Sequence, residues 1–356
     1  MLVQTYFPQK LSASRYDTFL ASGWFRGSVM LYKMDLLCLE GDVRSVVNIR
    51  LDLNKHDYSK SHRKIIKRVE ERFTFTYGEA FASPEKEVLY ARHKNRFKGF
   101  IHPTLTDYLN SGFYQNVFDT QEICVYDGDK LIAVSFFDRG ERSMASLLGL
   151  YDENYHKFSL GLYTMLKEIS LGKSWNYRWY YPGYVLDQSS QFDYKLRLGE
   201  FEYYNQRQRW AKFTNFSASE TKTFEIKAAI AELEEKLVAA KIPFAKTLYP
   251  LFSLGYVGYW NAEFVKYPIF LSVQLPGDQE LLMTYDIDLR AFVVNKIVEA
   301  PEYDHLINME ASSDFGKGDD YLMKLMMVSE HLLIVPAHET RMLDAFIEQS
   351  AATWFN

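Results

Sequence analysis

The pattern of apolar and polar positions in the middle of the chain predicts a β-meander. Residues 121–153 alternate in three runs, and the turns between them are centred on Gly128 and Gly140. Residues 158–172 carry a helical pattern that we expect to end at the final glycine, and residues 175–181 alternate again as a strand. A meander, a helix and a strand that can lie parallel to the last meander strand together form an α/β unit with a crossover.

The N-terminal pattern predicts helices and strands around one strongly basic helix. Residues 16–27 and 83–97 are helical in pattern, and residues 45–53 alternate as a strand. In the helix expected over residues 59–73, the cations are spaced so that all of them share one face. These cations are Lys60, Arg63, Lys64, Lys67 and Arg68. Such a face is either simply solvated or follows a phosphate backbone.

The pattern changes after residue 212. A polar linker leads to a helix whose apolar residues, among them Ile226 and Leu237, share one face. A strand pair is expected around residues 276–278, followed by a helix-like segment over residues 319–335 and a last helix. We therefore predict one region over residues 1–212 and an acidic C-terminal α+β domain over residues 213–356.

The charge of the chain follows the same division. The 356 residues carry a formal net charge of −5, which separates into +5 for residues 1–212 and −10 for residues 213–356. This asymmetry indicates that only the first region meets an anion, if either does.

Several classes of protein are excluded by what the sequence lacks. No apolar run reaches the roughly eighteen residues of a membrane span, and the N-terminus has no signal-peptide pattern. The two cysteines, Cys38 and Cys124, form neither a disulfide framework nor a metal motif, and they favour a cytoplasmic location. Walker A, GxGxxG, HExxH and GxSxG motifs are absent.

The loop after the aromatic strand is the strongest candidate for a site. It begins at Pro182-Gly183 and contains Asp187, Tyr194 and Lys195. These residues lie beyond the end of a predicted strand, where α/β sheets place their ligands.

This loop and several other blocks resemble the aminoacyl-tRNA–protein transferases, both the arginyl-tRNA–protein transferases and the bacterial leucyl-tRNA–protein transferases. The similar blocks are residues 16–33, 46–68, 87–97, 150–169 and 183–195. The resemblance covers about residues 15–210 and implies a fold related to the GNAT acyltransferases. We therefore expect an α+β / α/β fold with a GNAT-like mixed sheet (antiparallel meander, helix, crossover strand) and an additional C-terminal α+β domain.

The resemblance implies an aminoacyltransferase that moves an amino acid, arginine favoured over leucine, from charged tRNA to the N-terminal amine of an acceptor protein. Such a transfer is an N-degron-type modification, and acceptors with an acidic N-terminal residue are expected. Aminoacyl-tRNA would be the co-substrate, with no other cofactor. No metal is expected either, because the family's N-terminal cysteine cluster is missing and Cys38 has no neighbouring cysteine.

The resemblance also implies roles for individual residues. Asp152 or Asp187 would hold the incoming ammonium and take its proton, and Tyr194 and Lys195 would donate to the oxyanion or hold an acidic acceptor side chain. The residues implied in substrate binding are Tyr32, Arg50, Tyr90, Arg92, Tyr151, Ser159, Gly161, Gly183 and Tyr184. The basic face of residues 60–68 would contact the tRNA.

Two other functions remain open at this point. One is an acyltransferase of the same fold that uses acyl-CoA, which tight binding of acetyl-CoA would favour. The other is a non-catalytic adaptor that recognises protein N-termini, which peptide binding without turnover would select.

Overall fold

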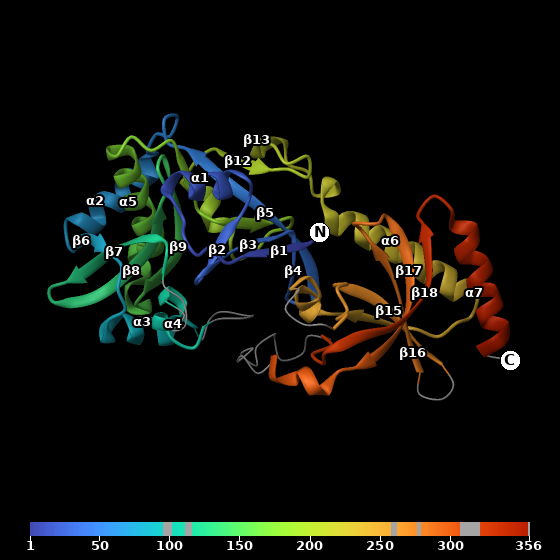
Figure 1. The fold of residues 1–356 in the computed structure, drawn as a ribbon. Coiled ribbons are helices and arrows are strands. Elements are labelled where there is room, and N and C mark those ends of the chain that lie inside the picture. Colours follow the sequence, from blue (N-terminus) through green and yellow to red (C-terminus); the bar gives the residue numbers. More distant parts are fainter. Residues whose placement is uncertain (95–101, 111–115, 258–261, 276–278, 307–320, 355–356) are drawn as a thin grey trace.

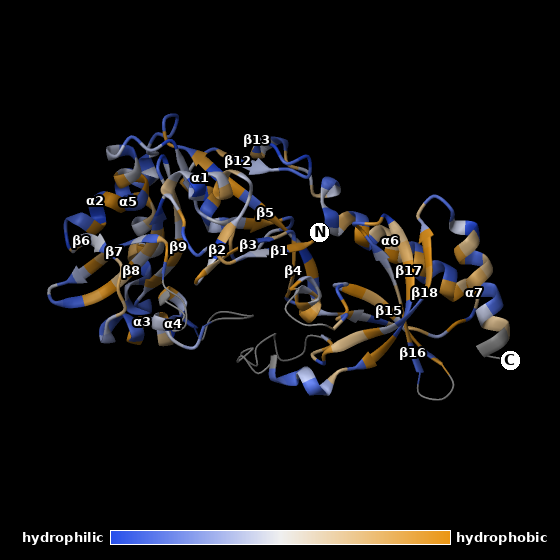
Figure 2. Ribbon diagram, in the orientation of Figure 1, coloured by the Kyte–Doolittle hydropathy of each residue, from blue (hydrophilic) through white to orange (hydrophobic). Residues whose placement is uncertain are grey.

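Two α/β layered bodies lie side by side in the computed structural model, and β1, β4 and β5 run between them (Figure 1). The structure describes residues 1–94, 102–110, 116–257, 262–275, 279–306 and 321–354. The predicted turn at residues 276–278 and the end of the predicted helix over residues 83–97 lie outside these ranges. Apolar residues concentrate on the strands of both bodies (Figure 2).

The first body is built on a ten-stranded mixed sheet in the described part of the chain. Its main path is β13 (Trp210–Lys212), β12 (Phe201–Tyr204), β5 (Asp42–Asp52), β10 (Trp179–Tyr181), β9 (Ser143–Tyr151), β8 (Lys130–Arg139), β7 (Asp119–Asp127) and β6 (Thr74–Glu79). Two further strands, β4 (Leu36–Leu39) and β11 (Tyr184–Leu186), pair with β5. A small antiparallel sheet has the order β1 (Val3–Tyr6), β3 (Met30–Met34) and β2 (Phe25–Gly27).

The predicted meander, helix and parallel strand are confirmed. Strands β7, β8 and β9 pair antiparallel, α5 (Leu160–Ser174) follows, and β10 pairs in parallel with β9. The fold is thus the GNAT-like mixed sheet expected from the sequence.

The predicted boundaries of α5 and β10 are wrong. Helix α5 continues through Gly172 and gives way at Asn176, whose φ of +58° is left-handed, so β10 begins only at Trp179. Gly172 is needed for close packing instead, because a Cβ there would come within 2.6 Å of Met144 Sδ and 2.9 Å of Leu53 Cδ1.

Four further helices accompany this sheet in the described residues: α1 (Ala13–Ala21), α2 (Lys60–Glu70), α3 (Pro84–Lys94) and α4 (Leu105–Asn110). Helix α2 starts with a capping box, in which Ser59 Oγ accepts from His62 N and His62 Nδ1 accepts from Ser59 N. Its apolar face, which includes Ile65 and Val69, belongs to the same buried cluster as α5. The capping box and this packing fix α2 against α5.

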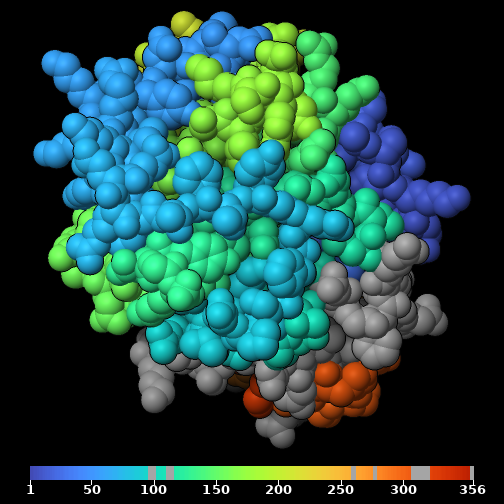
Figure 3. Space-filling model, turned by 90° about the vertical axis from the view of Figure 1, so that its left-hand side faces the viewer, coloured from blue at the N-terminus to red at the C-terminus, as the bar shows by residue number. Residues whose placement is uncertain are grey.

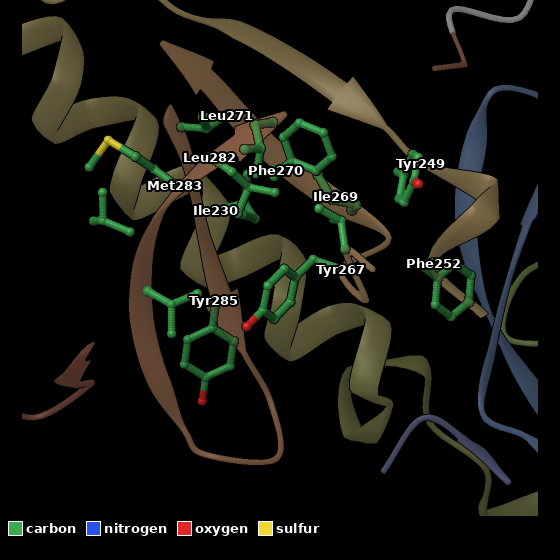
Figure 4. Packing of buried hydrophobic residues seen from close by; sticks show 14 of the residues in the cluster. Ile230, Tyr249, Phe252, Tyr267, Ile269, Phe270, Leu271, Leu282, Met283 and Tyr285 are labelled. Carbon is green, nitrogen blue, oxygen red and sulfur yellow. The ribbon is translucent and has the colours of Figure 1, made fainter. Parts of the chain in front are cut away.

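The second body is an antiparallel five-stranded sheet with two helices in the described residues. The strands, in spatial order, are β14 (Ala245–Leu248), β15 (Ile269–Leu275), β16 (Gln279–Asp286), β17 (Ala291–Glu299) and β18 (Met326–Pro336). Helix α6 (Lys222–Ala239) buries the predicted face that contains Ile226 and Leu237, and α7 (Thr340–Trp354) completes the layer. Figure 4 shows Ile230 of α6 among the side chains of β15 and β16.

Residues 319–320 of the helix expected over residues 319–335 lie outside the described residues, and the rest of this prediction is wrong. Residues 326–336 form β18, which pairs along its whole length with β17 and contains two register shifts. Pairing with a neighbouring strand outweighs the local helical pattern of this segment.

Polar contacts and a shared core join the two bodies. Ser45 Oγ on β5 lies 2.5 Å from Thr223 Oγ1 at the start of α6. Lys227 pairs with Asp42 at 2.5 Å. Leu36 and Val43 of the first region are buried in the same apolar cluster as the five-stranded sheet. β5 therefore supports both bodies.

Candidate active site

The candidate site begins where β9 and β10 separate. The two strands pair in parallel only over Ser143–Ala145 and Trp179–Tyr181. The chain turns away at Gly183, whose φ of +93° is left-handed, and β11 then pairs antiparallel with β5. Along its other edge, β9 meets β8 with a bulge between Phe136 and Phe137. Within the described residues, the second half of β9 is therefore paired on one edge alone.

A cavity of about 590 Å³ lies at this separation. Its walls come from the second half of β9, the N-terminal half of α5, the turn between β10 and β11, and the short helix η2 (Asp193–Leu198). Rings of Trp24, Phe25 and Tyr108 also line it. The site therefore combines an apolar wall with a few polar groups, which is typical of a small-molecule or peptide site.

Glu168 is the buried carboxylate of this cavity. It lies on α5, has no exposed surface, and lines the cavity. Its Oε2 accepts a 2.7 Å hydrogen bond from Tyr180 Oη, while its Oε1 has no partner among the described residues. Burial raises the pKa of Glu168 to about 7, and the hydroxyls of Tyr180, Ser135 and Ser146 act in the opposite direction. The carboxyl group therefore changes its charge near neutral pH.

Lys195 is a positively charged residue of the same cavity wall. Its Nζ donates to Tyr184 O at 3.0 Å and lies about 5 Å from the Tyr184 and Phe192 rings. No carboxylate pairs with it in the part of the chain that the structure describes. Burial lowers the pKa of Lys195 to about 8. A cation in this setting is suited to bind an anionic group of a ligand.

Two histidines hold the segment that carries Lys195. His62 of α2 contacts Arg197 O at 2.7 Å through Nε2, and His56 contacts Leu198 O at 2.9 Å. Both histidines are buried, with 4% and 5% of their surface exposed. Because these carbonyl oxygens end η2, the basic helix α2 and the cavity wall are connected directly.

The structure brings many of the predicted site residues together in the cavity wall. From the first half of the chain and the β9–α5 connection these are Tyr32, Tyr151, Ser159 and Gly161. From the loop they are Gly183, Tyr184, Tyr194 and Lys195. Ser159 stands at the N-cap of α5 with φ +57° and makes no side-chain capping bond.

The two predicted catalytic aspartates lie elsewhere. Asp152 is not in the cavity wall; it caps η1 (Glu153–Phe158) and accepts from Lys130 at 2.8 Å. Its burial opposes ionisation, but the hydrogen bonds from Lys130 and Asn154 leave its pKa below the usual value. Asp187 is buried beside Thr221, the N-cap of α6, at 3.5 Å. The arrangement of these aspartates therefore favours structural rather than catalytic roles.

Three predicted substrate-binding residues also lie outside the wall. Arg50 pairs with Glu202 at 2.7 Å and lies over the rings of Trp179 and Trp210. Tyr90 is buried, and its hydroxyl donates to a backbone carbonyl. Arg92 is an exposed residue of α3 that lies 3.9 Å from Asp152.

The predicted basic face of α2 is exposed along its length. Lys60, Arg63, Lys64, Lys67 and Arg68 all face solvent, whereas His62, Ile65 and Val69 face inward. Helix α2 lies at the end of the molecule that is turned to the viewer in Figure 3. Because the inward face also holds η2, the outer cations and the cavity share one helix.

Glu168 was not predicted from the sequence. A signal for it exists in the spacing of Gly161, Thr164, Met165 and Glu168, which puts all four on one side of α5. All four line the cavity. The pattern could not have revealed which side of a helix buried on both sides faces a cavity.

Metal and membrane features are absent from the described residues. No three His, Cys, Asp or Glu side chains among them are grouped to hold a metal ion. Cys38 and Cys124 are both buried and unpaired with each other. The described helices contain none that is long and apolar enough to cross a membrane.

Comparison with known proteins finds similarity over most of the region that forms this cavity. Residues 85–205 match the family model described as arginine-tRNA-protein transferase, C terminus. An aspartate/glutamate leucyltransferase of Campylobacter jejuni is 24% identical over 166 residues, which are 43% of this chain and 66% of that protein. A protein of the same name from Leptospira interrogans is 24% identical over 195 residues, which are 53% of this chain and 74% of that protein.

Among solved structures, a GCN5-related glucosamine N-acetyltransferase region of a fungal multidomain protein aligns with a TM-score of 0.30 and 14% identity. The alignment covers 56% of this chain and 22% of that one. The assignment of the fold therefore rests on the order and direction of the strands themselves.

The strand order and the cavity define a GNAT-like protein. Residues 85–205 are similar to the aminoacyl-tRNA–protein transferases. The matched segment is just under two thirds of the Campylobacter relative's length.

The raised pKa of Glu168 predicts a pH-dependent stability. Folded Glu168 binds its proton up to about pH 7, whereas the unfolded side chain releases it near its ordinary pKa of 4.5. The folded state therefore binds more protons between these values, and stability falls as the pH rises. We expect the free energy of unfolding of the wild type, relative to Glu168→Gln, to fall by about 2–3 kcal/mol between pH 5 and pH 8.

Urea unfolding at both pH values measures this difference. Glu235→Gln, at an exposed position of α6, is the matched control and should show no pH-dependent difference from the wild type. If the free energies of unfolding of wild type and Glu168→Gln differed by the same amount at both pH values, the raised pKa would be contradicted.

Proposed function

We propose that this protein transfers an amino acid from a charged tRNA to the N-terminal amine of an acceptor protein. The observation that carries the proposal is the cavity formed largely by the family-matched region. The wall of this cavity contains a buried carboxylate, Glu168, and a cation without a carboxylate partner among the described residues, Lys195. These are groups that an incoming ammonium and an anionic centre require.

The chemistry required of the protein is modest. The ester of a charged tRNA is already activated, so the site must position the amine, keep it unprotonated and stabilise the oxyanion. We therefore propose that no cofactor takes part. Because charged tRNA is the donor, the cytoplasm is the compartment we propose.

Lys195 is proposed to bind the acceptor rather than the tRNA. The relatives are named for aspartate and glutamate, which supports an acceptor with an acidic first residue. An acidic side chain would gain a charge-assisted hydrogen bond from Lys195 Nζ, in a wall also formed by Tyr184 and Phe192. Tyr194, which is 45% exposed at the same rim, is placed to donate to the same anionic groups.

The exposed cations of α2 are proposed to bind the tRNA backbone. Their spacing places successive positive charges along about two turns of helix, which suits neighbouring phosphates. Since His62 on the inner face contacts η2, a tRNA on the outer face would lie against the helix that supports the cavity wall.

The direct assay mixes the purified chain with charged Arg-tRNA or Leu-tRNA and a peptide that begins with Asp or Glu. Transfer of a labelled amino acid from either tRNA supports the proposal, and the two tRNAs decide which residue is transferred. No labelled peptide with either tRNA would reject the function.

Replacing Lys195 with alanine should weaken the acceptor's binding selectively. We expect KM for a peptide beginning with Asp or Glu to rise roughly tenfold, the loss of about 1.4 kcal/mol of binding. KM for an otherwise identical peptide with an uncharged first residue should change much less, because it loses no charge-assisted bond. Steady-state kinetics with the two peptides measures the difference.

The control is Lys10→Ala, which removes the same charge from an exposed position outside the cavity wall. Equal effects of Lys195→Ala on both peptides would show that Lys195 does not select the acidic residue.

Removing cations from α2 should lower the salt sensitivity of tRNA binding. In the triple variant Lys60→Ala, Lys64→Ala, Lys67→Ala, we expect weaker binding and a log–log salt slope that is shallower by about two to three. Titrations of labelled tRNA at several salt concentrations measure this slope. The matched control removes Lys246, Lys324 and Arg341 from the second body; a similar change there would mean that net charge, not α2, attracts the tRNA.

A further inference from the structure

This inference rests on the proposed function. The transfer requires that a proton be removed from the acceptor's N-terminal ammonium, and the cavity contains a group that can accept it. An N-terminal amine has a pKa of roughly 7.7–8.0, so at neutral pH most acceptors arrive as ammonium ions. An ammonium nitrogen has no free electron pair and cannot attack an ester carbonyl. A cavity group that takes one proton from the acceptor would therefore speed the reaction at neutral pH.

Glu168 is the only carboxylate among the described residues of the cavity wall. The two aspartates implied by the sequence lie outside the wall and are engaged with Lys130 and with the start of α6. Glu168 has no exposed surface, and its Oε1 lacks a hydrogen-bond partner among the described residues. A buried carboxylate oxygen left without a partner is costly unless a ligand satisfies it.

The surroundings of Glu168 hold it in place without neutralising it. Tyr180 Oη on β10 donates to Oε2 at 2.7 Å, and the hydroxyls of Ser135 on β8 and Ser146 on β9 face it. Tyr194 and Lys195, both on η2, line the same cavity. No cation pairs with the Glu168 carboxylate in the described residues. An incoming ammonium would therefore meet a carboxylate whose charge is not already neutralised.

We propose that Glu168 is the base that takes the proton from the attacking N-terminal ammonium. The carboxylate accepts one N–H proton, and the freed electron pair of the nitrogen forms a bond to the ester carbonyl carbon. The bond between that carbon and the ribose oxygen of the tRNA then breaks. The nitrogen's second proton passes to this ribose oxygen, and Glu168 returns its own proton to water.

The proton affinities match this step. Burial raises the pKa of Glu168 to about 7, within about one unit of the amine it serves. General bases are most effective when their pKa lies near the working pH. A carboxyl group with an ordinary pKa would be too weak a base for the same transfer.

The test measures the single-turnover rate of peptide aminoacylation against pH, with charged tRNA bound in excess. For the wild type we expect the rate to rise through about pH 7. Glu168→Gln, whose amide oxygen can still accept from Tyr180, should be about 100-fold slower at pH 7. Its remaining rate should rise only near the acceptor's own pKa of about 8, because only pre-formed neutral amine then reacts.

Tyr180→Phe is the second variant, and it separates a base from a merely structural carboxylate. It keeps the carboxyl group but removes a hydrogen bond that lowers the pKa of Glu168. The rising part of its pH profile should therefore move to higher pH than in the wild type. Binding of a non-reactive charged-tRNA analogue should be unchanged in both variants.

Three outcomes decide the inference. A slow Glu168→Gln with a displaced profile, together with the upward shift in Tyr180→Phe, supports it. A Glu168→Gln enzyme with wild-type rate and profile overturns it and assigns proton removal to water or to another group of the wall. Absence of transfer by the wild type itself would reject the proposed function instead, so the two failures are distinguishable.

Discussion

The site depends on a parallel strand pair that ends after three residues. Strands β9 and β10 pair over Ser143–Ala145 and Trp179–Tyr181, and no further. Continued pairing would fill the space along β9 with backbone. Instead, the left-handed Gly183 directs the chain to β5, and the bulge at Phe136–Phe137 disturbs the opposite edge of β9. The cavity, the buried face of α5 and the position of η2 all follow from this separation.

Strand β5 provides the second constraint, because it serves both bodies. Its C-terminal half pairs with β10, β11 and β12 beside the cavity. Its N-terminal half pairs with β4 and contacts α6 through Ser45. Asp187, at the end of β11, lies beside Thr221 at the start of α6. The loop that carries Lys195 is therefore connected at its beginning to the second body and at its end to α2.

Local pattern predicted the elements of the central unit because each has a clear period. The alternation in β7, β8 and β9 and the helical spacing in α5 were sufficient to give the correct connection order. The end of α5 was predicted wrongly because Gly172 was taken as a helix stop. The glycine is needed instead because Met144 and Leu53, which are distant in sequence, leave no room for a side chain. Residues 326–336 were predicted as a helix but form a strand, because they pair with β17. Both errors arise from long-range contacts that a local window does not contain.

The part of the candidate site that lies just beyond the end of a strand could be predicted from the sequence. Tyr194 and Lys195 lie in the cavity wall as the loop position indicated. Asp187 does not, because β11 folds back onto β5 and turns this residue toward α6. Glu168 could not be recognised, since its significance comes from burial, a missing partner for Oε1 and the separation of two strands.

The central claim is that the cavity between β9 and β10 receives the aminoacyl group. A crystal structure of the protein with a non-hydrolysable aminoacyl-adenosine analogue of the tRNA 3′ end tests it directly. We expect the aminoacyl group inside the cavity, in contact with the second half of β9, with its ester carbonyl carbon within reach of an acceptor amine that Glu168 would deprotonate. An analogue bound outside this cavity would contradict the proposal.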